Sequence, residues 1–279
     1  GRGPAAGAPR GYVRRRRDLR AARRRDARVS GTRGRRVLAP TPRESSRRYS
    51  TIELWRRAGA VAALVRKRLE PGDRAVLCYA PGLEFLVAFH GCLRAGILAV
   101  PAFPPDPRKE TKDATHFAAI LESSGAAAVL SDTSYLRARA LARCAAFDIP
   151  WVATDAAPSG SGAPAAPYES NVAFLQYTSG STSAPKGVVV TRSNLAHNLE
   201  LITAALSSDE QTVCVSWLPQ YHDMGLVGSL LGTLYCGGRG YHSSPLAFVR
   251  DPTRWLRDVT NYRATHVQAP SFARDGSAD

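Results

Sequence analysis

Apolar segments of strand length alternate with longer segments of helical periodicity over residues 50–268. The first helical segment begins at Ser50 or Thr51, either of which can cap it, and apolar residues then recur at helical spacing until Pro71. Strands that alternate with helices of this length are typical of βαβ crossovers and a largely parallel sheet covered by helices. The sequence therefore predicts an α/β fold.

The pattern gives approximate boundaries for each element. The expected strands are 75–79, 97–100, 126–130, 150–153, 172–177, 188–190, 213–217 and 265–268. The expected helices are the one ending at Pro71, about 83–95, one before residue 126, 135–146, 193–206, 224–235 and 252–262.

A segment rich in Pro, Gly, Ser and Ala at 156–167 interrupts this alternation and reads as a flexible linker. We expect a first α/β subdomain at 49–155 and a second at 168–279. The sequence stops soon after an expected strand, so we expect the second subdomain to be incomplete at its C-terminal end.

Residues 1–48 are rich in Arg and carry nearly all of the formal net charge of +15. They contain few large apolar residues, and we therefore expect a disordered tail. An organelle transit peptide and an arm for nucleic acid or anionic lipid are alternatives to a simple solvated tail. We favour the solvated tail because charged runs are usually solvated and Tyr12 is the single aromatic residue in the tail that could stack on bases. The nearly neutral remainder gives no reason to expect nucleic-acid binding by the folded body.

The five cysteines include no CxxC pair and no neighbouring His at ligand spacing. They are therefore expected to be reduced, buried thiols of an intracellular, cytoplasmic protein. The longest uncharged apolar stretch, Met224 to Gly238, is too short and too polar for a membrane-spanning helix.

The most informative segment, 174–188, joins two apolar strands through a loop of small and hydroxyl-bearing residues that ends in Lys186. Such a loop exposes backbone N–H groups and hydroxyls that can surround a polyphosphate, and Lys186 adds a positive charge. Gly187 allows a close approach that a Cβ would obstruct. The loop is not a Walker loop, because Pro185 stands where that motif needs Gly. A flexible surface loop is the weaker alternative.

This segment, Tyr-Thr-Ser-Gly-Ser-Thr-x-x-Pro-Lys-Gly, resembles the phosphate-loop signature of the adenylate-forming (AMP-dependent synthetase/ligase) enzymes. The later run Trp-Leu-Pro-Gln-Tyr-His-Asp-Met-Gly-Leu at 217–226 is similar to the fatty acyl-AMP ligase branch in particular. The resemblance covers about 49–273 and does not extend into the Arg-rich tail. It implies a truncated N-terminal adenylate-forming domain with βαβ subdomains.

The resemblance implies ATP-dependent activation of a fatty acid to an acyl-adenylate with release of pyrophosphate. ATP and Mg²⁺ are the implied cofactors, and an acyl carrier protein or polyketide-synthase module is the implied acceptor. The residues that match the family's β- and γ-phosphate contacts are Thr178, Ser179, Gly180, Ser181, Thr182 and Lys186. Ser183 stands where many members have Gly, which stiffens the loop.

His222 matches a family position beside the acyl carboxylate and the α-phosphate, where an imidazole N–H donates to developing negative charge. Without that match, a structural histidine is the better interpretation. A metal pair of His222 and Asp223 is disfavoured, because adjacent side chains diverge and no third ligand follows. We assign no metal ligand. Glycines 225, 228 and 232 either clear a channel for an acyl chain or allow close packing.

The adenine-binding segment, the acid that binds magnesium, and the C-terminal lid with its catalytic Lys have no counterpart in these residues. Because lid closure completes such a site, we expect the chain alone to be inactive or weakly active. Two alternatives remain: part of an acyl-CoA ligase, or a non-catalytic protein that binds fatty acid or a partner.

Overall fold

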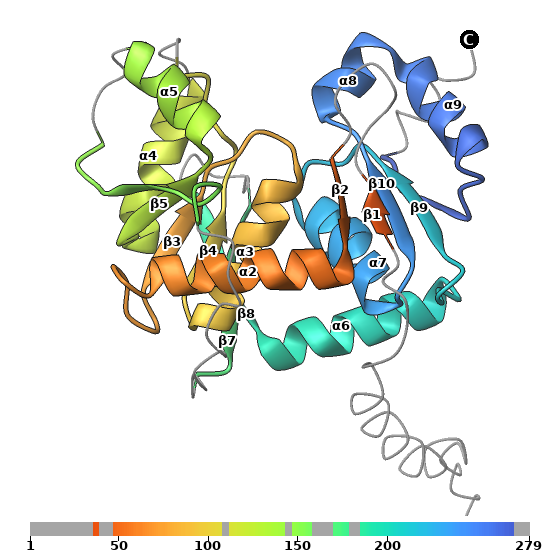
Figure 1. Ribbon diagram of the computed structural model, residues 1–279, viewed down its shortest axis with the longest axis horizontal. Helices are drawn as coiled ribbons and strands as arrows, with labels where there is room; N and C mark the ends of the chain where they lie inside the picture. Colours follow the sequence, from red (N-terminus) through yellow and green to blue (C-terminus); the bar gives the residue numbers. More distant parts are fainter. Residues whose placement is uncertain are drawn as a thin grey trace, which may run out of the picture. The chain divides into compact units, whose positions relative to one another are not determined.

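The computed structural model describes residues 36–38, 47–107, 112–142, 147–157, 170–178 and 185–270. Residues 35–279 belong to one compact unit. Its described part contains a six-stranded sheet and a five-stranded sheet, with helices packed against both (Figure 1).

The six-stranded sheet is parallel except at one edge. Its order is β6 (Trp151–Ala153), β5 (Ala128–Ser131), β3 (Arg74–Leu77), β4 (Leu98–Pro101), β7 (Val172–Thr178) and β8 (Lys186–Thr191). Only the last pair, β7 and β8, is antiparallel. The expected α/β fold with a largely parallel sheet is thus confirmed. Most of the expected linker, residues 158–167, lies outside the described residues. The strands before and after it belong to one sheet, in which β7 pairs with β4.

Alternating side chains of β3 supply two hydrophobic cores, one on each face of this sheet. Ala75 and Leu77 pack into the core shared with α2 (Thr51–Val65) and α3 (Leu83–Ala95). Val76 packs on the opposite face, in the core that includes residues of α4 (Lys112–Ser124). This period of two is the pattern of a strand buried on both faces, and each fully buried aliphatic side chain contributes about 2 kcal/mol.

The five-stranded sheet has the order β11 (His266–Val267), β9 (Val213–Ser216), β10 (Arg239–His242), β1 (Arg36–Leu38) and β2 (Arg48–Ser50). Strand β1 lies inside the segment 1–48, so the expectation of disorder was wrong for these three residues. The short strand gains backbone pairing from β10 on one side and β2 on the other, which composition cannot reveal. The other residues of 1–46 lie outside the described part of the chain.

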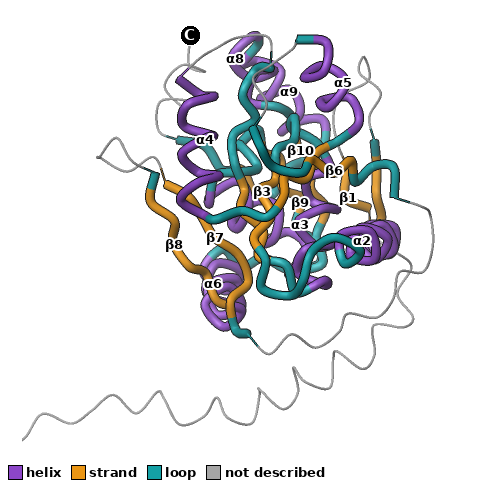
Figure 2. The backbone as a smooth tube through the Cα atoms, turned by 90° about the vertical axis from the view of Figure 1, so that its left-hand side faces the viewer, coloured by secondary structure: helices purple, strands orange, loops and turns teal. Residues whose placement is uncertain are grey.

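Short helices and a local core cover this second sheet. Trp217 stacks on Phe248 of α8 (Pro245–Arg250), and Phe248 meets Trp255 of α9 (Pro252–Asn261) edge to face. Helix α6 (Arg192–Ala205) follows β8 directly and lies beside β7 and β8 (Figure 2). Helix α5 (Thr133–Leu141) is shorter than expected and ends before residues 143–146, which are not described.

The helix expected at 224–235 is divided in two. Residues Met224–Leu231 form the π-helix η3, and α7 (Gly232–Tyr235) continues from it. Wide turns of this kind are rare and are often found at functional sites. Met224, the first residue of η3, directly follows His222 and Asp223 in the sequence.

No helix among the described residues is both long and apolar enough to cross a bilayer. Four cysteines are described, and all are free thiols, three of them buried. Burial raises the pKa of Cys78 and of Cys92 to about 12, so both stay protonated and unreactive. Cys144 lies outside the described residues.

Candidate functional site

The antiparallel pair β7 and β8 carries the two described ends of the predicted phosphate loop. Thr178 closes β7, Lys186 opens β8, and the two residues are paired across the strands. Of the predicted phosphate contacts, Thr178 and Lys186 are described, whereas Ser179, Gly180, Ser181 and Thr182 lie outside the described residues. The structure thus has the predicted strand on each side of the loop, with Lys186 exposed at the loop's exit.

Gly187 makes the close approach that the sequence indicates, and its neighbour is the ring of Tyr177. A Cβ at Gly187 would lie 2.9 Å from Cζ of Tyr177. The Tyr177 hydroxyl donates to Oγ of Ser123 at 3.1 Å, which ties the hairpin to α4. Gly187 therefore leaves room for the Tyr177 ring, whose hydroxyl connects the end of β7 to α4.

A cavity of about 270 Å³ opens at this end of β7. Its apolar wall comes from the end of β4, the segment that follows β4, and α4, and its polar groups come from α4, β7 and the loop after β9. The lining residues are Pro101, Ala102, Phe103, His116, Ile120, Gln176, Tyr177, Thr178, Tyr221, His222 and Asp223. Two of the predicted site residues, Thr178 and His222, thus meet at one cavity although 44 positions separate them in the sequence.

The His222 side chain is 60% exposed and contacts the carboxylate of its neighbour. Its Nδ1 lies 2.7 Å from Oδ1 of Asp223. The expectation that these adjacent side chains diverge was wrong. They converge because the N–H of Met224 approaches both, at 2.6 Å from Asp223 Oδ1 and 3.3 Å from His222 Nδ1. Nδ1 of His222 therefore contacts groups of its own loop, and Nε2 is the ring nitrogen available to a ligand.

His222 and Asp223 are both potential metal ligands. Within the described ranges, no three His, Cys, Asp or Glu residues are grouped closely enough to hold a metal ion. The contact between His222 and Asp223 instead fixes the orientation of the imidazole ring, as carboxylates commonly do for histidines at reactive sites.

Two buried glutamines anchor the segment that carries His222, and sequence reasoning missed both. Gln220 accepts from the N–H of Gly82 at 2.9 Å and donates to the carbonyl of Ala80 at 3.1 Å. Gln176 donates from Nε2 to the carbonyl of Tyr221 at 2.9 Å. A polar side chain inside the apolar strand 172–177 was the available signal for Gln176, whereas its partner 45 positions away has no local signal.

Gly225 lies near the C-terminal end of the same segment. A Cβ there would lie 2.0 Å from the carbonyl oxygen of Pro219, so no side chain fits. The same carbonyl accepts from the N–H of His222 at 3.1 Å. At Gly228 a Cβ would lie 2.9 Å from Oε1 of Gln268. Both glycines therefore serve close packing, which was one of the two interpretations left open by the sequence.

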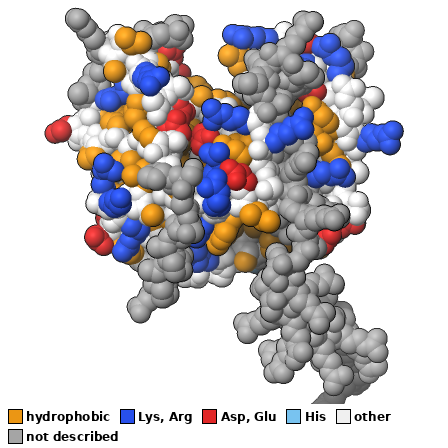
Figure 3. Space-filling model, in the orientation of Figure 1, with side chains coloured by type: hydrophobic (Ala, Val, Ile, Leu, Met, Phe, Trp, Pro, Cys, Tyr) orange, Lys and Arg blue, Asp and Glu red, His pale blue; other side chains and the backbone are white. Residues whose placement is uncertain are grey.

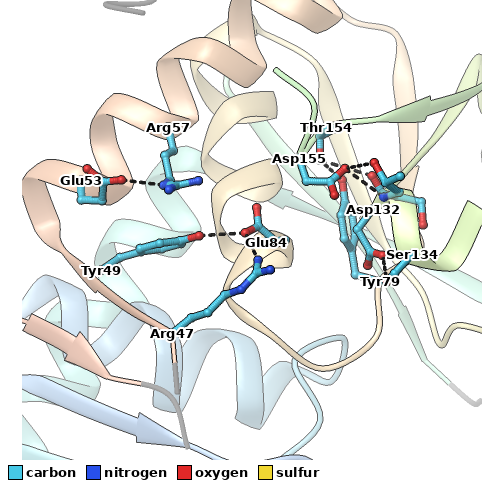
Figure 4. Close-up of polar contacts among 12 residues, drawn as sticks. Arg47, Tyr49, Glu53, Arg57, Tyr79, Glu84, Asp132, Ser134, Thr154 and Asp155 are labelled. Carbon is cyan, nitrogen blue, oxygen red and sulfur yellow. Dashed lines mark hydrogen bonds and ion pairs between the residues drawn. The ribbon is translucent and has the colours of Figure 1, made fainter. Parts of the chain in front are cut away.

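A second polar cluster, also missed from the sequence, joins β2 to α2 and α3 (Figure 4). Glu84 accepts from the hydroxyl of Tyr49 and from Nη1 of Arg47, each at 2.8 Å. The guanidinium of Arg57 lies 4.5 Å from the centre of the Tyr49 ring and bonds Glu53. Burial, with Glu84 adding to it, raises the pKa of Tyr49 to about 12. None of the predicted site residues belongs to this cluster, which we interpret as structural.

Basic and acidic side chains of the described residues are intermixed on the face drawn in Figure 3. The Glu53 carboxylate alone bonds two arginines, Arg56 and Arg57. Charges paired in this way neutralise one another locally and add little to stability at a surface.

The family model described as AMP-binding enzyme matches residues 23–274. The chain belongs to the AMP-binding enzyme family. The resemblance to adenylate-forming enzymes, inferred from the phosphate loop, is thereby confirmed. The match begins inside the Arg-rich segment, so the expectation that the resemblance begins only at about residue 49 was wrong. Residues before 49 also take part in the fold, because β1 belongs to the five-stranded sheet.

Curated relatives of the chain are named as fatty acid ligases. It is 39% identical over 228 residues to JamA of Moorena producens, a medium-chain fatty acid–acyl-carrier-protein ligase, with 79% of this chain and 38% of JamA covered. It is 37% identical over 230 residues to FadD32 of Mycolicibacterium smegmatis, a long-chain fatty acid–AMP ligase, with coverage of 78% and 36%. FadD21 of Mycobacterium tuberculosis, a putative fatty acid–CoA ligase, is 34% identical, with coverage of 79% and 40%.

Solved structures agree with these relatives. The fatty acyl-adenylate ligase of L. pneumophila, in complex with acyl adenylate and pyrophosphate, matches with a TM-score of 0.79 and 34% identity. That match covers 92% of this chain and 44% of the ligase. The chain thus spans about two fifths of the length of the curated relatives it matches.

Proposed function

We propose that this chain forms the phosphate-loop part of a fatty acyl-AMP ligase, which activates a fatty acid with ATP and releases pyrophosphate. The observation that carries the proposal is the meeting of Thr178 and His222 at one cavity, at the end of the strand that leads into the loop. The similarity to fatty acid ligases and to a solved acyl-adenylate complex supports it.

In the proposed reaction a carboxylate oxygen of the acid attacks the α-phosphorus of ATP. A C–O–P linkage forms, the bond between the α-phosphorus and its bridging oxygen breaks, and pyrophosphate carries that oxygen away. Positioning and neutralisation of charge dominate chemistry of this kind. We assign the β- and γ-phosphates to the loop from Thr178 to Lys186, through Thr178, Ser179, Gly180, Ser181, Thr182 and Lys186.

His222 is proposed to donate from Nε2 to the negative charge that develops between the carboxylate and the α-phosphate. Two protonation patterns allow this. A neutral ring accepts the Met224 N–H at Nδ1 and carries its proton on Nε2, whereas an imidazolium carries both protons and is stabilised by Asp223. In both patterns the exposed nitrogen is the donor.

Mg²⁺ belongs to the function that we propose, since it neutralises phosphate charge when bound with ATP. The described residues do not fit a site for it, because they contain no group of three potential ligands. We therefore assign no ligand of this chain to the ion and derive no step through it.

The proposed acceptor is an acyl carrier protein or a polyketide-synthase module, in line with JamA, which acts on a carrier protein. Part of an acyl-CoA ligase is the second candidate, and the similarity to FadD21 favours it. The free thiols support the cytoplasm as the proposed compartment, because such compartments keep thiols reduced.

Calorimetric titration of the chain with ATP, with and without a fatty acid, tests the proposal without requiring turnover. We expect ATP to bind, and Lys186→Ala to weaken binding about tenfold, because a charge-assisted contact to phosphate is worth roughly 1.5–3 kcal/mol. Lys67→Ala removes an exposed lysine at the end of α2 and serves as the control.

Binding of fatty acid with no binding of ATP would reject the ligase and favour the non-catalytic alternative. If the chain binds ATP, supplying either coenzyme A or a carrier protein to acyl-adenylate in its presence separates the two ligase classes. The acceptor that becomes acylated identifies the class.

A further inference from the structure

Strand β7 carries one buried amide in an otherwise apolar segment. Gln176 is 7% exposed, and it follows Phe174, which is 1% exposed in the main core. Its Nε2 donates to the carbonyl of Tyr221 at 2.9 Å and to that of Tyr177 at 3.3 Å. Burying an amide is unfavourable unless it is hydrogen-bonded, so these two bonds hold the side chain in one orientation.

The bond to Tyr221 joins the two halves of the proposed site. Gln176 lies two residues before Thr178, and Tyr221 directly precedes His222. A single side chain therefore connects the strand that enters the phosphate loop with the segment that presents the imidazole. Both hydrogen bonds of the amide are donated by the same atom, Nε2, so a side chain of β7 holds the Tyr221 carbonyl directly.

The other end of this amide is not paired. Gln176 Oε1 is buried and has no hydrogen-bond partner among the described residues. Gln176 also lines the cavity shared by Thr178 and His222. An unpaired buried acceptor costs free energy, so the residue is not explained by stability alone.

Other contacts that hold the His222 segment in place do not involve β7. Gln220 ties it to the turn between β3 and α3, and Gly225 packs against the Pro219 carbonyl within the segment itself. Among the side chains that anchor this segment in the described structure, Gln176 is the one supplied by the strand of the phosphate loop.

We propose that Gln176 is a positioning residue that couples occupancy of the phosphate loop to the orientation of His222. The coupling rests on the proposed function, because it needs a phosphate ligand at the loop. The anchoring of the Tyr221 carbonyl does not depend on that function, so the two parts fail separately.

Two measurements on the full chain test the proposal. Hydrogen–deuterium exchange of the amides in 217–226 reports the anchoring, with 75–79, in and directly after β3, as the internal reference. The NMR signals of the His222 imidazole, assigned with His222→Gln and recorded with and without ATP, report the coupling. The variants are Gln176→Leu, which removes the donor, and Gln176→Asn, which keeps the amide on a shorter side chain. Gln211→Leu, at an exposed position, is the matched control.

We expect Gln176→Leu to raise exchange in 217–226 about tenfold, since one net hydrogen bond is lost, while exchange in 75–79 stays unchanged. The response of His222 to ATP should disappear while the affinity for ATP changes less than about threefold. If Gln176→Leu unfolds, seen as faster exchange in 75–79, Gln176→Asn is expected to give the same local effect on a folded chain.

Unchanged exchange in 217–226 for both variants would overturn the anchoring and with it the proposal. A His222 response to ATP equal to that of the unmodified chain would overturn the coupling. If the unmodified chain binds no ATP, the proposed function and the coupling are rejected together, and the exchange data still decide whether Gln176 anchors the segment.

Discussion

Nδ1 of His222 lies 2.7 Å from Oδ1 of Asp223, so the side chains of two adjacent residues that line the cavity contact each other. This contact favours a proton on Nδ1, whereas the N–H of Met224 favours a bare Nδ1. The balance between the two decides which tautomer the ring adopts.

Asp223→Ala should shift the neutral ring of His222 toward the tautomer with its proton on Nε2. The ¹⁵N chemical shifts of the two ring nitrogens measure the tautomer directly. Glu70→Ala, which removes an exposed carboxylate on the turn after α2, should leave these shifts unchanged. Identical shifts in the unmodified chain and Asp223→Ala would show that Asp223 does not orient the ring.

Gly225→Ala should destabilise the protein and displace the His222 segment. The added Cβ would lie 2.0 Å from the Pro219 oxygen, and both atoms belong to backbone that cannot swing aside. Overpacking of this kind costs about 1–3 kcal/mol, measurable by urea unfolding. Gly82→Ala is the control, because its backbone is extended and a Cβ meets its nearest neighbour at 3.9 Å. Equal stability of the two variants would contradict the packing role.

The sequence predicted the parts of the fold whose signal is local. Strands β3 and β7 are short, mostly apolar segments, and the helix α2 has a capping residue, Ser50, whose side chain accepts from the N–H of Glu53. Strand β1 escaped prediction because its backbone pairing comes from β2 and from β10, and β10 lies about 200 residues away in the chain. No local pattern encodes such a pairing.

The same distinction holds for the site. Thr178 and Lys186 were predicted from the composition of a contiguous loop, and His222 from a resemblance that contiguous residues carry. Gln176 and Gln220 were missed because their importance lies in bonds to distant carbonyls, which exist only after folding. Buried amides inside apolar segments are therefore the feature to search for in related chains.

Phe89→Ala should cost about 3–5 kcal/mol of the free energy of unfolding, because it empties a fully buried ring site. The Phe89 ring meets Phe174 of β7 edge to face, with 5.3 Å between the ring centres, so the loss also loosens the strand that carries Gln176. Leu141→Ala, at a side chain that is 86% exposed, should change stability by less than about 0.5 kcal/mol. Urea unfolding of both variants checks the contrast, and a cost below that of a surface substitution would place Phe89 outside the core.

Stability should fall as the pH drops from about 6.5 toward 4, and His242 of β10 contributes to that fall. Burial lowers the pKa of His242 to about 4, whereas in the unfolded chain it titrates near 6.5. Between these values the unfolded chain binds more protons than the folded one, so the free energy of unfolding decreases as pH decreases. Above pH 6.5 both states are neutral and the contribution is complete. His242→Gln keeps a polar side chain that cannot be protonated, and it should flatten the dependence between pH 6.5 and 4 in urea titrations. His197→Gln, at an exposed position of α6, is the matched control for the substitution. If both variants retain the full slope, acid sensitivity arises at other groups and His242 is not buried in its neutral form.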